Sequence, residues 1–121
     1  GTWTPVPSRF SGGGITATYT SSGNYIKVGK EVTIFFNIVI TAITGQGSSL
    51  TYIGGLPFSP ADSYLATGVT GQRNGLATAA PILVAHSDSR LYLRDAGANA
   101  VNLTTNWQVG ELTGSITYRV A

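Results

Sequence analysis

The chain has 121 residues and a formal net charge of +2, and only 10% of its residues are charged, against roughly 25% in typical soluble domains. This length suits one domain that buries a core of its own, while the seven basic residues are scattered and form no patch of the kind that binds nucleic acid. The lack of cysteine excludes a thiolate metal site and a redox dithiol, and no apolar run approaches the roughly 18 residues of a membrane span.

The first strand is expected at residues 2–6, where a proline interrupts the pattern. Proline has no N–H to donate to a ladder, so this strand belongs at the edge of a sheet, with Trp3 tucked beneath it. Residues 14–20 (GITATYT) alternate hydrophobic and hydroxyl side chains and predict a second strand. A turn at 21–24 (SSGN) and a short strand at 25–28 are expected to follow.

The most regular stretch of the sequence is 31–42 (EVTIFFNIVITA). Its alternate positions carry large hydrophobes, which share one face because strand side chains point to opposite faces with a period of two. These residues are Val32, Ile34, Phe36, Ile38 and Ile40. The other face is mostly polar but carries Phe35 and Val39, so we expect part of it to be covered as well. A turn at 29–30 joins this central strand to 25–28 and completes a three-stranded antiparallel meander.

The middle of the chain predicts shorter strands and a loop rich in glycine and proline. A strand at 50–53 ends in GGLPFSP (54–60), which breaks regular structure while Leu56 and Phe58 anchor it to the core. Further on, we expect two less regular strands, at 64–69 and 76–79. Between them, residues 68–75 predict an exposed polar loop.

Residues 82–86 and 90–95 predict the two arms of a β-hairpin joined by a Ser-Asp-Ser turn. In the second arm the two leucines are expected to point inward and Tyr92 outward. A short strand is expected at 101–103, and the chain ends in a strand at 112–120. One face of that last strand carries Ile116, Tyr118 and Val120.

The pattern as a whole predicts an all-β fold with little or no helix, because no window longer than two turns shows a helical stripe. About eight to ten short strands separated by turns are typical of an antiparallel β-sandwich or jelly roll. We expect a single domain over residues 1–121. Because methionine is absent, we interpret Gly1 as an internal position and the chain as a fragment or processed product of a longer protein.

The groups that catalysis needs are sparse. Glycoside hydrolysis requires two carboxyl groups on facing walls, and nothing in the spacing of the five acidic residues brings a pair together. His86 neighbours Ser87 and Asp88, but a catalytic triad is assembled by the fold, and these three are more simply turn residues. One histidine without cysteine falls short of a zinc site, whereas calcium bound through Asp62, Asp88 or Asp95 stays open. We therefore expect no enzyme activity and assign no metal site and no cofactor.

Sugar-binding sites combine an exposed aromatic face with side chains that hydrogen-bond to hydroxyl groups, and this chain offers both. The candidate residues are Asp62, Tyr64, Gln72, Arg73, Asn74, Tyr92 and Trp107. The alternative for Trp107 is a cap on one end of the core, since tryptophan is usually largely buried. The alternative for Tyr92, between Arg90 and Arg94, is a contact between subunits, because tyrosine and arginine are enriched at interfaces.

Several segments carry a resemblance to a known family. They are TWTPV (2–6), YIKVGKEV (25–32), GLPFSP (55–60) and LTGSITYRVA (112–121). With the long alternating strand, they make the chain resemble a recurring C-terminal domain of bacteriophage tail fibres and tailspikes. The resemblance implies a β-sandwich of jelly-roll type that forms a parallel homotrimer at the distal tip of the fibre in the virion. It also implies contact with bacterial surface polysaccharide or lipopolysaccharide.

The leading hypothesis is therefore a non-enzymatic, lectin-like, trimeric domain that binds host-surface glycan. Phe35, Val39, Arg90 and Arg94 are the candidates for the trimer interface. The main alternative is a trimerisation or folding cap of the fibre without a ligand. A third hypothesis is a polysaccharide-modifying enzyme that uses His86 or Asp88. Neither nucleic acid nor membrane insertion is expected.

Overall fold

The computed structural model of the chain describes residues 1–9, 16–44, 51–62, 66–73, 82–94 and 109–121. Within these ranges the chain is all β, with strands and turns but no helix. The strands are β1 (Thr2–Trp3), β2 (Val6–Arg9), β3 (Thr16–Val28), β4 (Glu31–Thr44), β5 (Thr51–Gly54), β6 (Thr67–Arg73), β7 (Ile82–His86), β8 (Arg90–Arg94) and β9 (Gly110–Arg119). The predictions of an all-β fold and of about that number of strands are confirmed.

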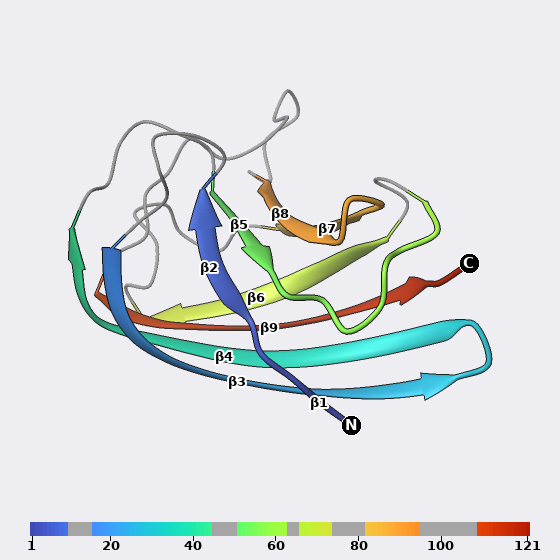
Figure 1. The fold of residues 1–121 in the computed structure, drawn as a ribbon, viewed down its shortest axis with the longest axis horizontal. Coiled ribbons are helices and arrows are strands. Elements are labelled where there is room, and N and C mark those ends of the chain that lie inside the picture. Colours follow the sequence, from blue (N-terminus) through green and yellow to red (C-terminus); the bar gives the residue numbers. More distant parts are fainter. Residues whose placement is uncertain (10–15, 45–50, 63–65, 74–81, 95–108) are drawn as a thin grey trace.

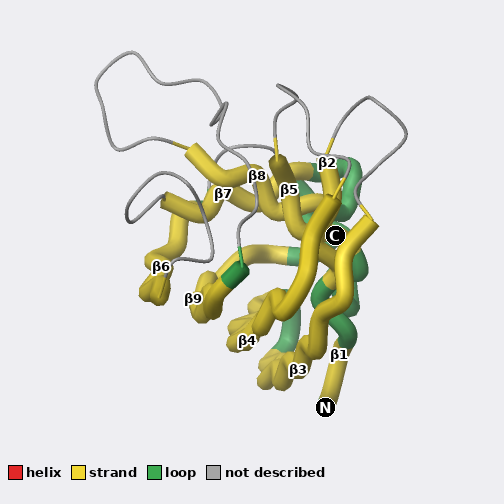
Figure 2. Tube along the Cα trace, turned by 90° about the vertical axis from the view of Figure 1, so that its left-hand side faces the viewer, coloured by secondary structure: helices red, strands yellow, loops and turns green. Residues whose placement is uncertain are grey.

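All nine strands belong to one antiparallel sheet in the order β1-β3-β4-β9-β6-β7-β8-β5-β2. The sheet curls into a half-barrel, in which β7, β8, β5 and β2 lie across from the long, curved β3, β4, β9 and β6 (Figures 1 and 2). β1 and β2 are separated only by Thr4 and Pro5, yet they occupy opposite ends of the strand order. The predicted strand at 2–6 is thus broken at its proline, and its two halves pair with different strands.

The concave side of the sheet holds the hydrophobic core. The alternate hydrophobes of β4 are all buried, with exposed fractions of 5% or less, which confirms the prediction for the central strand. The neighbouring strands add further buried side chains. These are Ile53, Leu83, Leu91, Leu93, Leu112, Ile116 and Tyr118. Leu56 and Phe58 pack against the core from the loop after β5, as the sequence predicted.

The predicted turn at 21–24 is wrong, because these residues continue β3 without a break. Ser21 and Ser22 lie opposite β4 in regular register, so the three-stranded meander is in fact a long two-stranded hairpin. Gly23 is needed for packing, since a β-carbon there would overlap the indole ring of Trp3. The turn at 29–30 is confirmed. The register of the hairpin shifts once, between Thr18 and Tyr19 of β3, where β4 carries one extra residue, Thr41.

The predicted polar loop at 68–75 is also wrong over its described part. Residues 68–73 belong to β6 and pair with β9, from Gly68 opposite Ile116 to Arg73 opposite Glu111. The glycine at 68 reflects a close approach between two strands, because a β-carbon there would overlap the Ser115 carbonyl oxygen. The predicted strand at 64–69 is described only from residue 66 onward, and those at 76–79 and 101–103 lie outside the described residues.

The hairpin near residue 88 and the terminal strand agree with the sequence. β7 and β8 pair from Ile82 opposite Arg94 to His86 opposite Arg90, with turn residues at 87–89 between them. In β9 and just after it, the predicted inward face of Ile116, Tyr118 and Val120 is buried. These two elements place the ends of β6, β7 and β9 close to one another.

Candidate functional site

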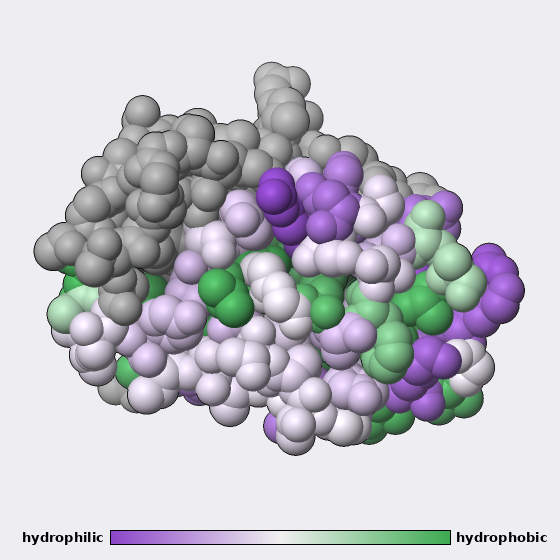
Figure 3. All heavy atoms as spheres, viewed as in Figure 1, coloured by the Kyte–Doolittle hydropathy of each residue, from purple (hydrophilic) through white to green (hydrophobic). Residues whose placement is uncertain are grey.

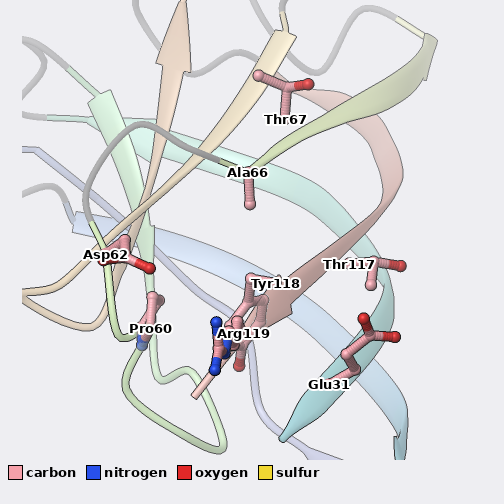
Figure 4. Close-up of a pocket in the computed structure, with 8 residues that line it drawn as sticks. All are labelled: Glu31, Pro60, Asp62, Ala66, Thr67, Thr117, Tyr118 and Arg119. Atoms are coloured by element: carbon pink, nitrogen blue, oxygen red, sulfur yellow. The ribbon is translucent and has the colours of Figure 1, made fainter. Parts of the chain in front are cut away.

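A cleft of about 530 Å³ opens beside the end of β9 (Figure 4). Its lining combines carboxyl, guanidinium and hydroxyl groups with a few apolar side chains. The lining residues are Glu31, Pro60, Asp62, Ala66, Thr67, Thr117, Tyr118 and Arg119. They come from the start of β4, the loop after β5, the start of β6 and the end of β9.

The cleft lies between two segments that contact β9 at different points, namely β6 and the loop after β5. β6 pairs with β9 as far as Gly68 opposite Ile116, and the Ala66 carbonyl accepts a hydrogen bond from the Ala85 N–H of β7, at 3.1 Å. Further along β9, the Ala61 N–H donates to the Arg119 carbonyl at 2.8 Å. The space between these two attachments is the cleft.

Three charged side chains line the cleft. Glu31 and Arg119 are cross-strand neighbours on β4 and β9, and Asp62 lies on the loop at the other side (Figure 4). The two ion pairs found among the described residues both involve Asp88, which is not part of this cleft. The charged groups of the cleft are therefore not neutralised by ion pairs within the described part of the chain.

Two threonines add hydroxyl groups. Thr67 opens β6, and Thr117 shares a hydrogen bond of 2.8 Å with Thr33 across the β4–β9 pair. A hydroxyl group both donates and accepts, whereas a carboxylate accepts and a guanidinium donates. The lining thus offers both donors and acceptors to the hydroxyl groups of a polyhydroxylated molecule.

Tyr118 lines the cleft but has a structural role. Its side chain is 3% exposed, and its hydroxyl group donates a hydrogen bond of 2.9 Å to the Phe58 carbonyl. Burial raises the pKa of Tyr118 to about 12, since the charged phenolate would lose its hydration. This ring is too enclosed to offer a stacking face to a sugar.

Of the predicted glycan-binding residues that the structure describes, only Asp62 lies at the cleft. Gln72 and Arg73 lie at the far end of β6, opposite Leu112 and Glu111, which is about 20 Å from Thr67 along the strand. The structure therefore does not bring them together with Asp62. Tyr64, Asn74 and Trp107 lie outside the described residues.

The expectation that Tyr92 points outward is wrong. Its side chain is only 7% exposed and stacks on the His86 ring, with the ring centres 4.6 Å apart. Its hydroxyl group donates to a carboxyl oxygen of Asp88 at 2.7 Å. Strand alternation places Tyr92 on the face of β8 opposite the buried leucines, and the His86 ring from β7 covers it there.

Asp88 is the centre of the contacts at the β7–β8 turn. One of its carboxyl oxygens lies 3.0 Å from Nδ1 of His86, and the other lies 3.7 Å from the Arg90 guanidinium. Arg90 in turn lies over the Tyr52 ring, 4.4 Å from its centre. Ser89 and Ser59 share a hydrogen bond of 2.6 Å that ties the turn to the loop after β5. These contacts fix the hairpin on the sheet.

Two of the four candidates for a subunit interface lie on the outer face of β4, and the other two lie on β8. Phe35 is 44% exposed and Val39 is partly exposed on this face. Arg90 is partly exposed at the hairpin, and the side chain of Arg94 lies outside what the structure describes. Figure 3 shows that the middle of the surface over β3 is nearly neutral in hydropathy, in keeping with its many threonine and serine residues.

The cleft residues that sequence reasoning missed are Glu31, Thr67, Thr117 and Arg119. Glu31 and Arg119 are separated by most of the chain and become neighbours only through the pairing of β4 with β9. Alternation in the sequence identifies a strand but not the strand with which it pairs, so no local signal identifies Glu31 and Arg119 as neighbours.

The described residues hold no group of three or more histidine, aspartate or glutamate side chains placed to bind a metal ion. None of the described segments forms a helix with the length and hydropathy that a membrane crossing needs. In comparisons with known proteins, the chain matches no protein-family model, no curated protein and no solved structure.

Proposed function

We propose that the chain is a non-enzymatic receptor-binding domain that holds a segment of bacterial surface polysaccharide in the cleft beside Asp62. The observation that carries this proposal is the cleft itself, whose volume of about 530 Å³ falls in the usual range for small-ligand sites. Its acidic, basic and hydroxyl side chains suit a ligand rich in hydroxyl groups. The candidate Asp62, chosen from the sequence, supports the same location.

We further propose that the half-barrel is a variant of the jelly-roll sandwich and that the domain forms a parallel homotrimer at the distal tip of a phage tail fibre or tailspike. The resemblance of its terminal and turn segments to that family supports this context. The exposed apolar side chains on the outer face of the sheet support self-association. Three copies on one axis would raise the effective concentration of weak sites and hence the avidity.

The test is binding to purified capsular and lipopolysaccharide fragments on a glycan array, followed by titration calorimetry. Arg119→Ala and Asp62→Ala should each weaken binding about tenfold or more. Glu111→Ala is the matched control, because Glu111 lies on the same strand as Arg119 but outside the cleft. Unchanged binding by both cleft variants would exclude this cleft as the site.

A second set of variants tests the other candidates named from the sequence. Arg73→Ala alters a residue of β6 that does not line the cleft, and Trp107→Ala alters a candidate that lies outside the described residues. If these variants abolish binding while the cleft variants retain it, the ligand binds elsewhere on the domain. If neither set matters on an array that the domain does bind, the carbohydrate contact lies outside both regions and the proposed site is wrong.

A purely structural trimerisation cap is the second candidate, and one observation favours it. Ile26, Val28 and Val69 are 62%, 73% and 71% exposed. All three lie on the outer face of the sheet, and exposed apolar side chains of this kind suit a contact with another subunit. Deletion of the domain from a fibre separates the two functions, because loss of a cap impairs assembly whereas loss of a receptor-binding domain impairs adsorption by assembled fibres.

A further inference from the structure

The charges around the cleft restrict the ligand that it can take, and this inference rests on the proposed function of the cleft as a saccharide site. We propose that the cleft accepts uncharged saccharide chains and excludes acidic ones, such as those rich in uronic acid. The relevant observation is the combination of two acidic side chains with a single basic one in its lining.

The arrangement of the three charges matters as much as their sum. Figure 4 shows Glu31 and Asp62 on opposite sides of the cleft, with Arg119 between them. A carboxylate that approaches the Arg119 guanidinium must therefore come near at least one like charge. Juxtaposition of like charges across an interface is strongly unfavourable, so the single guanidinium does not make the cleft an anion site.

The neighbouring lysines do not reverse this balance. Lys27 donates its ammonium group to the Gly29 carbonyl at 2.7 Å and lies 5.7 Å from the centre of the Phe58 ring. Lys30 is exposed at the β3–β4 turn and is not among the residues that line the cleft. The formal charge of the lining is therefore −1, from two acidic residues and one arginine.

The same groups favour an uncharged sugar. Each carboxylate accepts hydrogen bonds from hydroxyl groups, and neighbouring hydroxyl groups on a sugar ring present two donors to it. The guanidinium donates to ring and hydroxyl oxygens, while Thr67 and Thr117 can do either. An uncharged chain thus satisfies the polar groups of the cleft without a charge conflict.

The test compares polysaccharides that differ only in charge. Acidic bacterial polysaccharides are fragmented, and half of each sample is carboxyl-reduced, which converts every carboxylate to a primary alcohol on the same backbone. Calorimetry with the intact 121-residue chain should show at least about tenfold tighter binding of a reduced form than of its acidic parent. Naturally neutral polysaccharide fragments serve as additional probes.

Variants then test whether the two acidic residues are responsible. The double variant Glu31→Gln and Asp62→Asn removes both charges while retaining hydrogen-bonding side chains. Its affinity for the acidic fragments should rise about tenfold or more relative to its affinity for the reduced ones, so that the preference for the reduced form is lost. Glu111→Gln, an acid outside the cleft, should leave the preference as it is. Thermal unfolding of each variant verifies that it is folded.

The outcomes separate this inference from the proposed function. If acidic and reduced fragments bind equally well through the cleft, or if the double variant leaves the preference unchanged, charge exclusion is wrong while saccharide binding stands. If no fragment of either kind binds, both proposals are overturned. Tighter binding of the reduced form that disappears in the double variant supports both.

Discussion

The indole ring of Trp3 occupies the space that a side chain at Gly23 would need. The two residues face each other across the β1–β3 pair, and the ring nitrogen donates a hydrogen bond of 3.2 Å to the Phe35 carbonyl. The indole also meets Phe36 edge-on, with the ring centres 6.2 Å apart. One aromatic side chain therefore attaches the first strand to both β3 and β4.

We predict that Gly23→Ala lowers the free energy of unfolding by about 1–3 kcal/mol, because the added methyl group overlaps the indole ring. Urea denaturation measures this change. Gly54→Ala is the control, since its β-carbon would make only an ordinary contact of 3.5 Å with Tyr52. In a Trp3→Leu background, the cost of Gly23→Ala should shrink. An equal cost in both backgrounds would show that the indole is not the cause.

We predict that stability declines between about pH 10 and pH 12 because of Tyr118. Its pKa is about 12 in the folded protein and about 10 in an unfolded chain, so the unfolded state releases the proton first. The contribution is complete below pH 10 and is lost as pH rises through 12, with a total of about 3 kcal/mol. Urea unfolding across this range measures it.

Tyr118→Phe is the comparison for this pH effect. The variant loses the hydrogen bond to the Phe58 carbonyl and should be about 1 kcal/mol less stable at neutral pH. The difference in stability should narrow and then reverse as the pH rises to 12, because phenylalanine does not titrate and the wild type loses more than the hydrogen bond contributes. A constant difference from pH 8 to pH 12 would contradict the prediction.

We predict that Asp88→Ala destabilises the domain by about 1–3 kcal/mol, since the partly buried hydroxyl group of Tyr92 loses its acceptor Asp88. The double-mutant cycle with Tyr92→Phe should give a coupling energy of about 1 kcal/mol, measured by urea denaturation. Asp62→Ala, at an exposed position, should change stability little. Independent, additive effects of Asp88 and Tyr92 would show that their contact contributes nothing.

We predict that the domain self-associates through the outer face of its sheet and that Phe35→Thr combined with Val69→Thr abolishes this association. Both side chains lie in one cross-strand row, joined through Ser115. Val6→Thr is the control, because this exposed valine lies on β2 at the other end of the strand order. Analytical ultracentrifugation measures the mass. A wild-type chain that remains a single protomer at micromolar concentration would refute self-association.

The buried face of a strand can be predicted from the sequence wherever hydrophobic and polar side chains alternate regularly. The buried set of β4 and the inward face at the end of β9 follow from that alternation alone. The Ser-Asp-Ser turn between β7 and β8 was equally clear, because short polar residues favour turns. These elements depend on local chemistry, which the sequence carries directly.

Glycine has a different role at two positions from the one that its local sequence indicates. The sequences around Gly23 and Gly68 are typical of a turn and a loop, but each glycine lies within a strand that another group approaches closely. Tyr92 was misplaced because alternation identifies two faces without telling whether both are covered. The cleft could not be predicted, since Glu31 meets Arg119 only through the pairing of β4 with β9.

The position of β1 and β2 has a consequence for proteolysis. Residues 1–9 connect two strands that lie far apart in the strand order. β1 pairs with β3, and β2 pairs with β5 from Val6 to Arg9. A single cut near Thr4 would separate β1 from β2. Removal of residues 1–9 would leave the edges of both β3 and β5 unpaired. Unpaired strand edges pair with other chains, so proteolysis at this site would cause the domain to aggregate.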